Sequence, residues 1–207
     1  MAADPHPLEL FRFCPRCGSD AFAVHDFKSK ACGACGFVYY MNAAAATVAL
    51  IVDAEGRLLV ARRAREPAKG TLDLPGGFCD IGETLEAGLA REVAEETGLV
   101  VRGARLLFTL PNRYVYSGLT VPTVDAFFEC DVAGGASTLA AARPADDVAE
   151  LLWLPLRDVD PAQFGLESIR AGVTRFLRER GVSDTAGRST SCSKKEQDPH
   201  FWEDKST

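Results

Sequence analysis

The sequence predicts an α/β domain preceded by a small cysteine-rich module and followed by a polar tail. Three observations support this organisation. Between residues 41 and 180, apolar runs typical of strands alternate with two segments of helical periodicity. Four cysteines in two Cys-x-x-Cys pairs fall within residues 1–40. Residues 181–207 offer little apolar surface to bury, and we expect them to be disordered.

Local patterns predict each element of the α/β domain in turn. Strands are expected at residues 47–52, 57–62, 100–110, 120–132 and 149–156, the first two joined by an Asp-Ala-Glu-Gly turn. A helix is expected from Glu83 to Thr97, with Gly98 as its C-cap. Another is expected from Leu166 to Arg180, where apolar residues recur at helical spacing. At 207 residues and 47% hydrophobic, the chain suffices for one core and a satellite module.

Composition excludes several classes of function. A net charge of −6 and a pI of about 5.2 argue against a non-specific nucleic-acid or membrane-surface binder, which would normally be basic. No apolar run approaches the length of a membrane span, and the first residues lack the order of a signal peptide. We therefore expect a cytoplasmic protein with no membrane partner, in which cysteines remain reduced.

Four of the seven cysteines form a metal-ligand pattern. The pairs Cys14–Cys17 and Cys32–Cys35 are separated by 14 residues. Four thiolates can surround zinc in a closed tetrahedral site, which is structural because no position is left for water. The alternative is a redox Cys-x-x-Cys, which a single pair would leave open. A segment of this size lacks a core of its own, so we expect zinc to fold it.

The first predicted helix carries glutamates on one face. Glu92, Glu95 and Glu96 stand at i, i+3 and i+4, so their carboxylates are neighbours and repel one another. A hard cation such as Mg²⁺ or Mn²⁺ would relieve this repulsion. Arg91 can neutralise an adjacent acid, and the preceding Gly76-Gly77 pair lets backbone carbonyls approach the same cation. The alternative is a solvated acidic face on a surface helix.

The spacing of the whole stretch favours the metal site. It resembles the signature of the Nudix hydrolase superfamily, Gly-x5-Glu-x7-Arg-Glu-U-x-Glu-Glu-x-Gly-U with U aliphatic. Every fixed position is filled, at Gly77, Glu83, Arg91, Glu92, Val93, Glu95, Glu96, Gly98 and Leu99. With the surrounding strands, the resemblance extends over residues 45–178. It implies an α/β/α sandwich on a mixed sheet and hydrolysis of a nucleoside diphosphate linked to another group, with a divalent metal.

The resemblance assigns roles to individual residues. Glu92, Glu95 and Glu96 would hold Mg²⁺ or Mn²⁺ together with the carbonyl of Gly77. Arg91 would pair with Glu83 to brace the loop against the helix. Glu92, Glu96 and Arg91 are therefore the candidate catalytic residues of the helix.

The general base is left open by the sequence. Glu92 ranks first, and members of the superfamily also recruit an acid from a later loop. Here that loop offers Glu150, which ranks second, as well as Asp146 and Asp147. Ordinary loop charges are the alternative interpretation of these acids.

Substrate contacts are predicted from residue type alone. Arg63 and Arg113 can meet a phosphate, and Tyr116 or Tyr114 can stack on a base. A solvated strand end or core packing would explain the same residues. The cysteine module resembles the NADH pyrophosphatase branch, but residues 106–125 lack that branch's Ser-Gln-Pro-Trp-Pro-Phe-Pro run.

Two functions are consistent with these features. The first is a Mg²⁺-dependent pyrophosphohydrolase that cleaves NAD(H), ADP-ribose, FAD or a similar compound. The second is a Nudix domain that senses a nucleotide without cleaving it, with a zinc ribbon that binds protein or RNA. The intact acidic triad favours the enzyme. Nucleic acid is not an expected partner, except a capped RNA end, and the resemblance makes a homodimer plausible.

Overall fold

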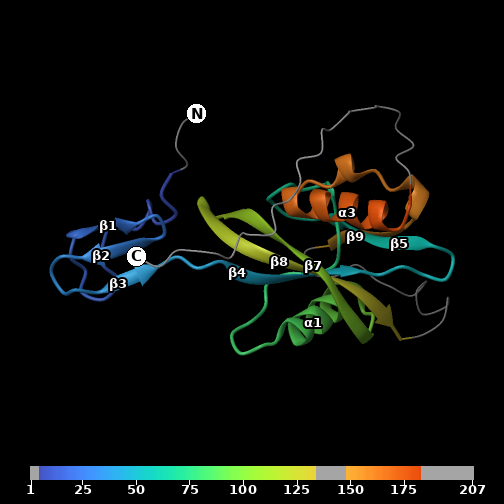
Figure 1. Cartoon of the computed structure of the whole chain (residues 1–207), viewed down its shortest axis with the longest axis horizontal. Helices are drawn as coiled ribbons and strands as arrows, with labels where there is room; N and C mark the ends of the chain where they lie inside the picture. The colour runs from blue at the N-terminus through green and yellow to red at the C-terminus, as the bar shows by residue number, and fades with distance from the viewer. Residues whose placement is uncertain (1–4, 134–147, 183–207) are drawn as a thin grey trace, which may run out of the picture.

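The cysteine-rich segment forms a small antiparallel sheet at one end of the molecule (Figure 1). This computed structural model describes residues 5–133 and 148–182. The strands of the N-terminal sheet run in the order β1-β2-β3. They are β1 (Phe22–Asp26), β2 (Ser29–Cys32) and β3 (Val38–Tyr40). Among the described residues, the buried apolar cluster of this sheet contains only Cys14, Phe22 and Cys32, with a few half-buried aromatic neighbours. So small a core leaves the sheet dependent on another source of stability.

The following residues form two three-stranded sheets. One has the order β4-β8-β7, from β4 (Ala44–Leu50), β8 (Leu119–Val132) and β7 (Val101–Tyr116). The other has the order β6-β5-β9, from β6 (Leu72–Asp73), β5 (Arg57–Arg63) and β9 (Val148–Pro155). Strand β4 runs parallel to β8, whereas the remaining pairs are antiparallel. The expected mixed sheet arrangement is confirmed.

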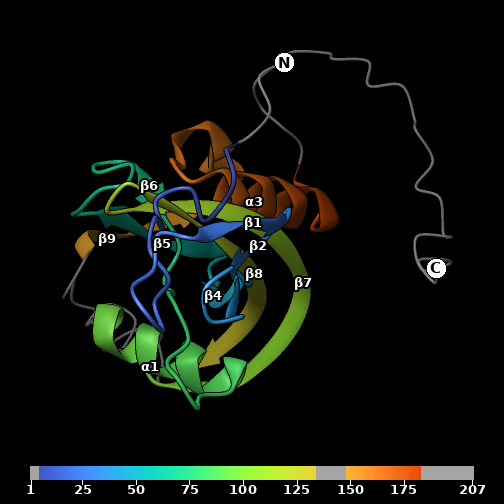
Figure 2. The same ribbon diagram turned by 90° about the vertical axis from the view of Figure 1, so that its left-hand side faces the viewer.

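Two helices cover opposite sides of these sheets, as Figures 1 and 2 show from perpendicular directions. They are α1 (Leu85–Thr97) and α3 (Glu167–Glu179), and two short 3-10 turns, Leu156–Asp158 and Pro161–Gln163, precede α3. Alternate residues of β4 explain the layering. Val48 and Leu50 are buried in the cluster that contains residues of α3, whereas Ala49, and Ile51 directly after the strand, are buried in the cluster that contains residues of α1. The predicted α/β/α sandwich is confirmed.

Several boundaries differ from the sequence prediction for identifiable reasons. The first helix begins at Leu85, because the Thr84 hydroxyl accepts a hydrogen bond from the Ala87 N–H and caps it, which leaves Glu83 in the preceding loop. Strands β7 and β8 form a longer hairpin than predicted, since their pairing continues to Tyr116 and Leu119. Strands β1–β3 and the two-residue β6 were not predicted. In the described part of the chain, neither helix has the length and apolar character of a membrane span.

Candidate active site and metal centres

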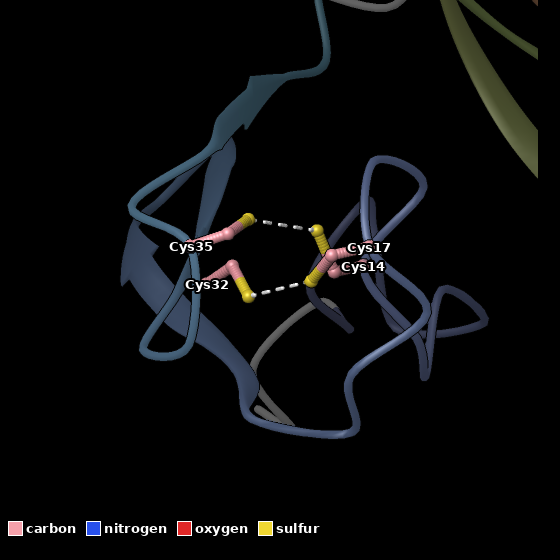
Figure 3. Close-up of side chains that lie close together, drawn as sticks. All are labelled: Cys14, Cys17, Cys32 and Cys35. Carbon is pink, nitrogen blue, oxygen red and sulfur yellow. Dashed lines mark hydrogen bonds between the residues drawn. The ribbon is translucent and has the colours of Figure 1, made fainter.

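The four predicted zinc ligands lie together in the N-terminal module. Sulfur–sulfur distances are 3.7 Å for Cys14–Cys35 and 3.7 Å for Cys17–Cys32. All four sulfur atoms fall within 4.8 Å of one another, and Figure 3 shows the side chains pointing toward a common centre. Tetrahedral zinc with Zn–S bonds of about 2.3 Å places its sulfur ligands about 3.8 Å apart. The geometry therefore fits a four-thiolate zinc ribbon.

The surroundings of Cys32 favour its thiolate form. Burial opposes ionisation of this thiol, but hydrogen bonds from the backbone N–H groups of Cys35 and Ala34, together with neighbouring thiols, outweigh it and lower its pKa to about 7. Because a metal binds the thiolate and not the thiol, these donors assist ligation.

The Gly76-Gly77 turn lies directly on the acidic face of α1. The Gly76 N–H donates to Oε2 of Glu96 at 3.0 Å, and the Gly77 carbonyl accepts from the Thr47 N–H at 2.8 Å. Gly76 has φ of +143°, and a Cβ there would overlap the carbonyl of Thr47. At Gly77 a Cβ would stand 2.7 Å from the carboxyl group of Glu92. A side chain is therefore excluded at Gly76 by the backbone of β4, and at Gly77 it would displace the carboxyl group of Glu92.

Gly76→Ala is expected to destabilise the fold by about 2–4 kcal/mol, because the added methyl group overlaps backbone that cannot move away. Gly82→Ala is the matched control, since Gly82 also has positive φ, +90°, but open space around it. We expect about 1–2 kcal/mol for that change from conformation alone. Urea unfolding of both variants measures the difference, and equal losses would show that the Thr47 contact is unimportant.

Arg91 connects the loop to the carboxylates of α1. Its Nε and Nη2 donate to the two oxygens of Glu83 at 2.9 and 3.0 Å. Its Nη1 donates to Glu92 at 2.9 Å and to Glu95 at 3.0 Å, and Nη2 also reaches the carbonyl of Phe78 at 3.0 Å. One guanidinium thus offsets the repulsion among three acids and fixes their positions.

The Glu83–Arg91 pair predicts a specific acid sensitivity. Hydrogen bonds from Arg91, then from the Asp80 N–H, lower the pKa of Glu83 from 4.5 to about 2. A carboxyl group with a depressed pKa stabilises the folded state above its unfolded pKa, and this contribution is lost as pH falls from about 4.5 to about 2. The melting temperature of wild type should exceed that of Glu83→Gln most at about pH 5 and above, and the difference should vanish near pH 2. A difference that does not change with pH would contradict this assignment.

A cavity of about 350 Å³ opens beside the turn and α1. Its wall includes Gly76, Gly77, Arg91 and the three carboxylates of Glu92, Glu95 and Glu96. Among the described residues, only the four cysteines bring three or more metal-ligating atoms within 4.8 Å of one another, so the glutamate oxygens are more widely spaced. The guanidinium of Arg91 lies between Glu92 and Glu95. Hard carboxylate oxygens, with a glycine turn against Glu92, nevertheless fit Mg²⁺ or Mn²⁺.

The residues predicted to contact substrate are not all at this cavity. Arg63 lines it, paired with the carboxylate of Asp73 and 3.4 Å from the hydroxyl of Tyr114, which lines it too. Arg113 is on β7 between two cavity residues but lines a separate cavity of about 520 Å³ beside the N-terminal segment. Tyr116 stands at the hairpin tip, 66% exposed, and is not among the residues that line the 350 Å³ cavity.

Of the three candidate acids from the later loop, the structure describes Glu150. The Glu150 carboxylate accepts from Nε of Arg62 at 3.0 Å, and Arg62 lines the cavity whereas Glu150 does not. Asp146 and Asp147 lie outside the described residues. The predicted tail of residues 181–207 also falls almost entirely outside them.

Several polar residues of the cavity were not predicted from the sequence. They include Thr47, Asp73, Asn112, Thr123 and Asp125. One signal was available for Asp125, because strand alternation places it on the same face as Phe127, which is fully buried. An aspartate facing a core is unusual unless its carboxylate is paired or functional.

Comparison with known proteins gives the family of this chain. Residues 41–176 match the NUDIX domain family. The chain therefore belongs to the NUDIX family. A NUDIX hydrolase structure from Nitrosomonas europaea has the same fold, with a TM-score of 0.62 at 21% identity over 82% of this chain and 92% of that one.

Two curated relatives differ in the substrates that their names state. The chain is 31% identical over 130 residues to a protein of Vibrio atlanticus named NAD-capped RNA hydrolase NudC, a match covering 63% of this chain and 45% of that protein. It is 32% identical over 121 residues to an ADP-ribose pyrophosphatase of Methanocaldococcus jannaschii, covering 58% of this chain and 66% of that protein. The chain thus spans about half to two thirds of the length of these relatives.

Proposed function

We propose that this protein is a divalent-metal-dependent pyrophosphohydrolase that cleaves the diphosphate of a nucleoside diphosphate linked to another moiety. The observation that carries the proposal is the placement of Glu92, Glu95 and Glu96 around one cavity, against a glycine turn in which Gly76 has no room for a side chain. These three carboxylates repel one another, and the single positive charge of Arg91, which bonds to Glu92 and Glu95, does not balance them, so a metal cation would be favoured beside them. A diphosphate needs that cation for its own charge to be neutralised.

Different residues of the site would bind the metal, position the carboxylates and accept a proton. Glu92, Glu95 and Glu96 would hold Mg²⁺ or Mn²⁺ with the Gly77 carbonyl, and a cation so bound offsets phosphate charge and lowers the pKa of a water molecule. Gly76 fixes Glu96 through its N–H, and Arg91 fixes Glu92 and Glu95. Glu92 is the first candidate to accept the proton of the attacking water, and Glu150 remains the second.

The substrate class follows from the relatives and from the cavity wall. One relative is named for NAD-capped RNA and the other for ADP-ribose, which supports a dinucleotide or nucleotide sugar such as NAD(H), ADP-ribose or FAD. Tyr114, whose ring packs edge-on against Phe78 with centroids 5.4 Å apart, takes the stacking role considered for Tyr116. Arg63 remains a candidate substrate contact at this cavity, but its pairing with Asp73 makes it less suited to a phosphate. The position of Arg113 suits a part of the substrate outside this cavity.

We also propose that zinc occupies the four-cysteine site in a structural role, and that the protein is cytoplasmic. A homodimer is expected from the family resemblance. A capped RNA end is the one nucleic-acid substrate that fits the acidic chain, and the name of one relative supports it.

A substrate panel tests the proposed function. Zinc-loaded protein is incubated with NADH, NAD⁺, ADP-ribose, FAD, diadenosine polyphosphates and nucleoside triphosphates, with Mg²⁺ or with chelator. We expect two phosphate monoesters, AMP among them, from at least one dinucleotide or nucleotide sugar in Mg²⁺ only. Binding of a nucleotide without turnover of any compound would instead support the sensing function.

A further inference from the structure

The cavity extends from the glutamates to a buried aspartate held by α3. Asp125 is 4% exposed, and its two carboxylate oxygens accept hydrogen bonds from the hydroxyls of Thr123 and Ser168, each at 2.5 Å. Ser168 is in the first turn of α3, so this helix fixes the carboxylate at the cavity wall. Each oxygen retains a lone pair for a further donor. Neither proposed metal binding nor water activation uses this group.

A second buried carboxylate adjoins the first. Asp73 is 9% exposed and accepts from the guanidinium of Arg63 and from the Leu74 N–H. Burial raises the pKa of Asp73, Arg63 opposes the rise, and the charge of Asp125 adds to it, which places the two acids within electrostatic reach. Together Asp73, Asp125 and Arg63 leave this end of the cavity with acceptors and excess negative charge. A diphosphate is disfavoured there.

One polar atom in the wall of the cavity is available to bond to an occupant. Thr47 lines it and is 1% exposed, yet its hydroxyl has no hydrogen-bond partner within the described part of the chain. A buried hydroxyl left without a partner is uncommon in a folded protein and commonly marks a place for water, an ion or a ligand.

The remaining wall beside the aspartates is apolar. Leu166 and Ile169 flank Ser168 on the side of α3, Val48 contributes from β4, and Leu74 contributes from the residue directly after β6. We call this part of the cavity the inner chamber: Asp73, Asp125, Thr123, Val48, Leu74, Leu166 and Ile169. Apolar walls suit the faces of a flat ring, and fixed carboxylates suit hydrogen-bond donors on its edge.

We propose that the inner chamber binds a heterocycle that carries an amino or carboxamide group, with the NH₂ donating to Asp125. The inference rests on the proposed function and fixes how the substrate lies: the donor-bearing ring enters the chamber, and the diphosphate stays beside Glu92 and Glu96. Two rings of a dinucleotide have this chemistry, the adenine with its amino group and the nicotinamide with its carboxamide. Substrates whose ring lacks the donor are disfavoured.

Two analogues of NAD⁺ test this and separate the two sources. Nicotinamide hypoxanthine dinucleotide exchanges the adenine amino group for a carbonyl, and 3-acetylpyridine adenine dinucleotide exchanges the carboxamide NH₂ for a methyl group. We expect kcat/KM for one of them to fall about 10- to 100-fold below that of NAD⁺, the range for losing one hydrogen bond to a charged group. The analogue with the lower kcat/KM identifies which ring lies in the chamber. Equal values within about threefold for all three compounds would overturn the proposal.

Calorimetric binding to Glu96→Gln in Mg²⁺ keeps this test distinct from that of the proposed function. Suppose that NAD⁺ binds more tightly than one analogue but that wild type turns over none of the compounds. This result would support the proposal for the chamber and reject the hydrolase. Turnover by wild type, with equal binding of NAD⁺ and both analogues, would support the hydrolase and reject the proposal for the chamber. Absence of binding for all three compounds at millimolar concentration, together with absence of their turnover by wild type, would overturn the proposal for the chamber, while the wider substrate panel still tests the hydrolase.

The variant Asp125→Asn assigns the effect to the carboxylate. Its amide keeps a hydrogen-bond acceptor for Thr123 or Ser168 but presents a donor to the ring, so preference should fall to about threefold or less. Asp131→Asn is the matched control, since Asp131 is exposed on the same strand, and it should keep the full preference. Undiminished preference in Asp125→Asn would overturn the proposal. The analogue comparison on the unaltered chain stands even if this variant does not fold.

Discussion

Glu96→Gln is expected to lower kcat/KM at least about 100-fold, the loss typical of removing one group that stabilises charge in the transition state. The reason is the removal of one of three negative charges proposed to hold the metal. The hydrogen bond with the Gly76 N–H can persist, because a glutamine side chain also offers an oxygen acceptor. The measurement is steady-state hydrolysis as a function of Mg²⁺ concentration, beside a melting curve.

Glu86→Gln provides the matched control for this variant. Glu86 is exposed in the first turn of the same helix and does not line the cavity. We expect wild-type activity from Glu86→Gln and a similar melting temperature for both variants. Retained activity in Glu96→Gln would contradict the assignment of Glu96 to the metal.

Loss of one zinc-ligating cysteine is expected to unfold the N-terminal sheet. Cys32→Ser should abolish stoichiometric zinc binding and expose the amides of β1–β3 to exchange, while the other sheets stay protected. Structural zinc supplies about 10–16 kcal/mol of binding free energy in comparable small modules. The cluster of Cys14, Phe22 and Cys32 is too small to replace it. Elemental analysis and hydrogen exchange measure the two effects.

Cys79→Ser serves as the control for zinc binding. Cys79 lies in the loop before α1 and is not part of the four-cysteine cluster. Its replacement should leave the zinc content at wild-type level. Wild-type zinc content and exchange protection in Cys32→Ser would reject a zinc-dependent ribbon.

The elements that the sequence predicted well depend on short-range patterns. Glu92, Glu95 and Glu96 share a face because helical geometry fixes spacings of three and four residues, and the two cysteine pairs are likewise local. The long hairpin was underestimated because the strand expected at residues 100–110 stops before Pro111, whereas β7 continues through this proline to Tyr116, and proline is a weak strand former.

Contacts between distant segments were beyond the sequence pattern. Asp125 meets Ser168 across 43 residues of chain, and Arg63 meets Tyr114 across 51. Tyr114 and Tyr116 look equivalent in an extended strand, yet only Tyr114 lines the 350 Å³ cavity, since Tyr116 is the last residue before the hairpin turn. The β-propensity of the residues predicts that a strand forms here. It does not predict which residues of the strand face a cavity that other elements build.

The most direct test of the central claim is hydrolysis of NAD⁺ and ADP-ribose with Mg²⁺ in isotopically labelled water, followed by mass spectrometry of the products. Attack of water on the diphosphate predicts two phosphate monoesters, with a single labelled oxygen on one of the two phosphates and none elsewhere. Label on a sugar carbon, or intact nucleotides after prolonged incubation with zinc-loaded protein, would contradict a pyrophosphohydrolase acting on these substrates.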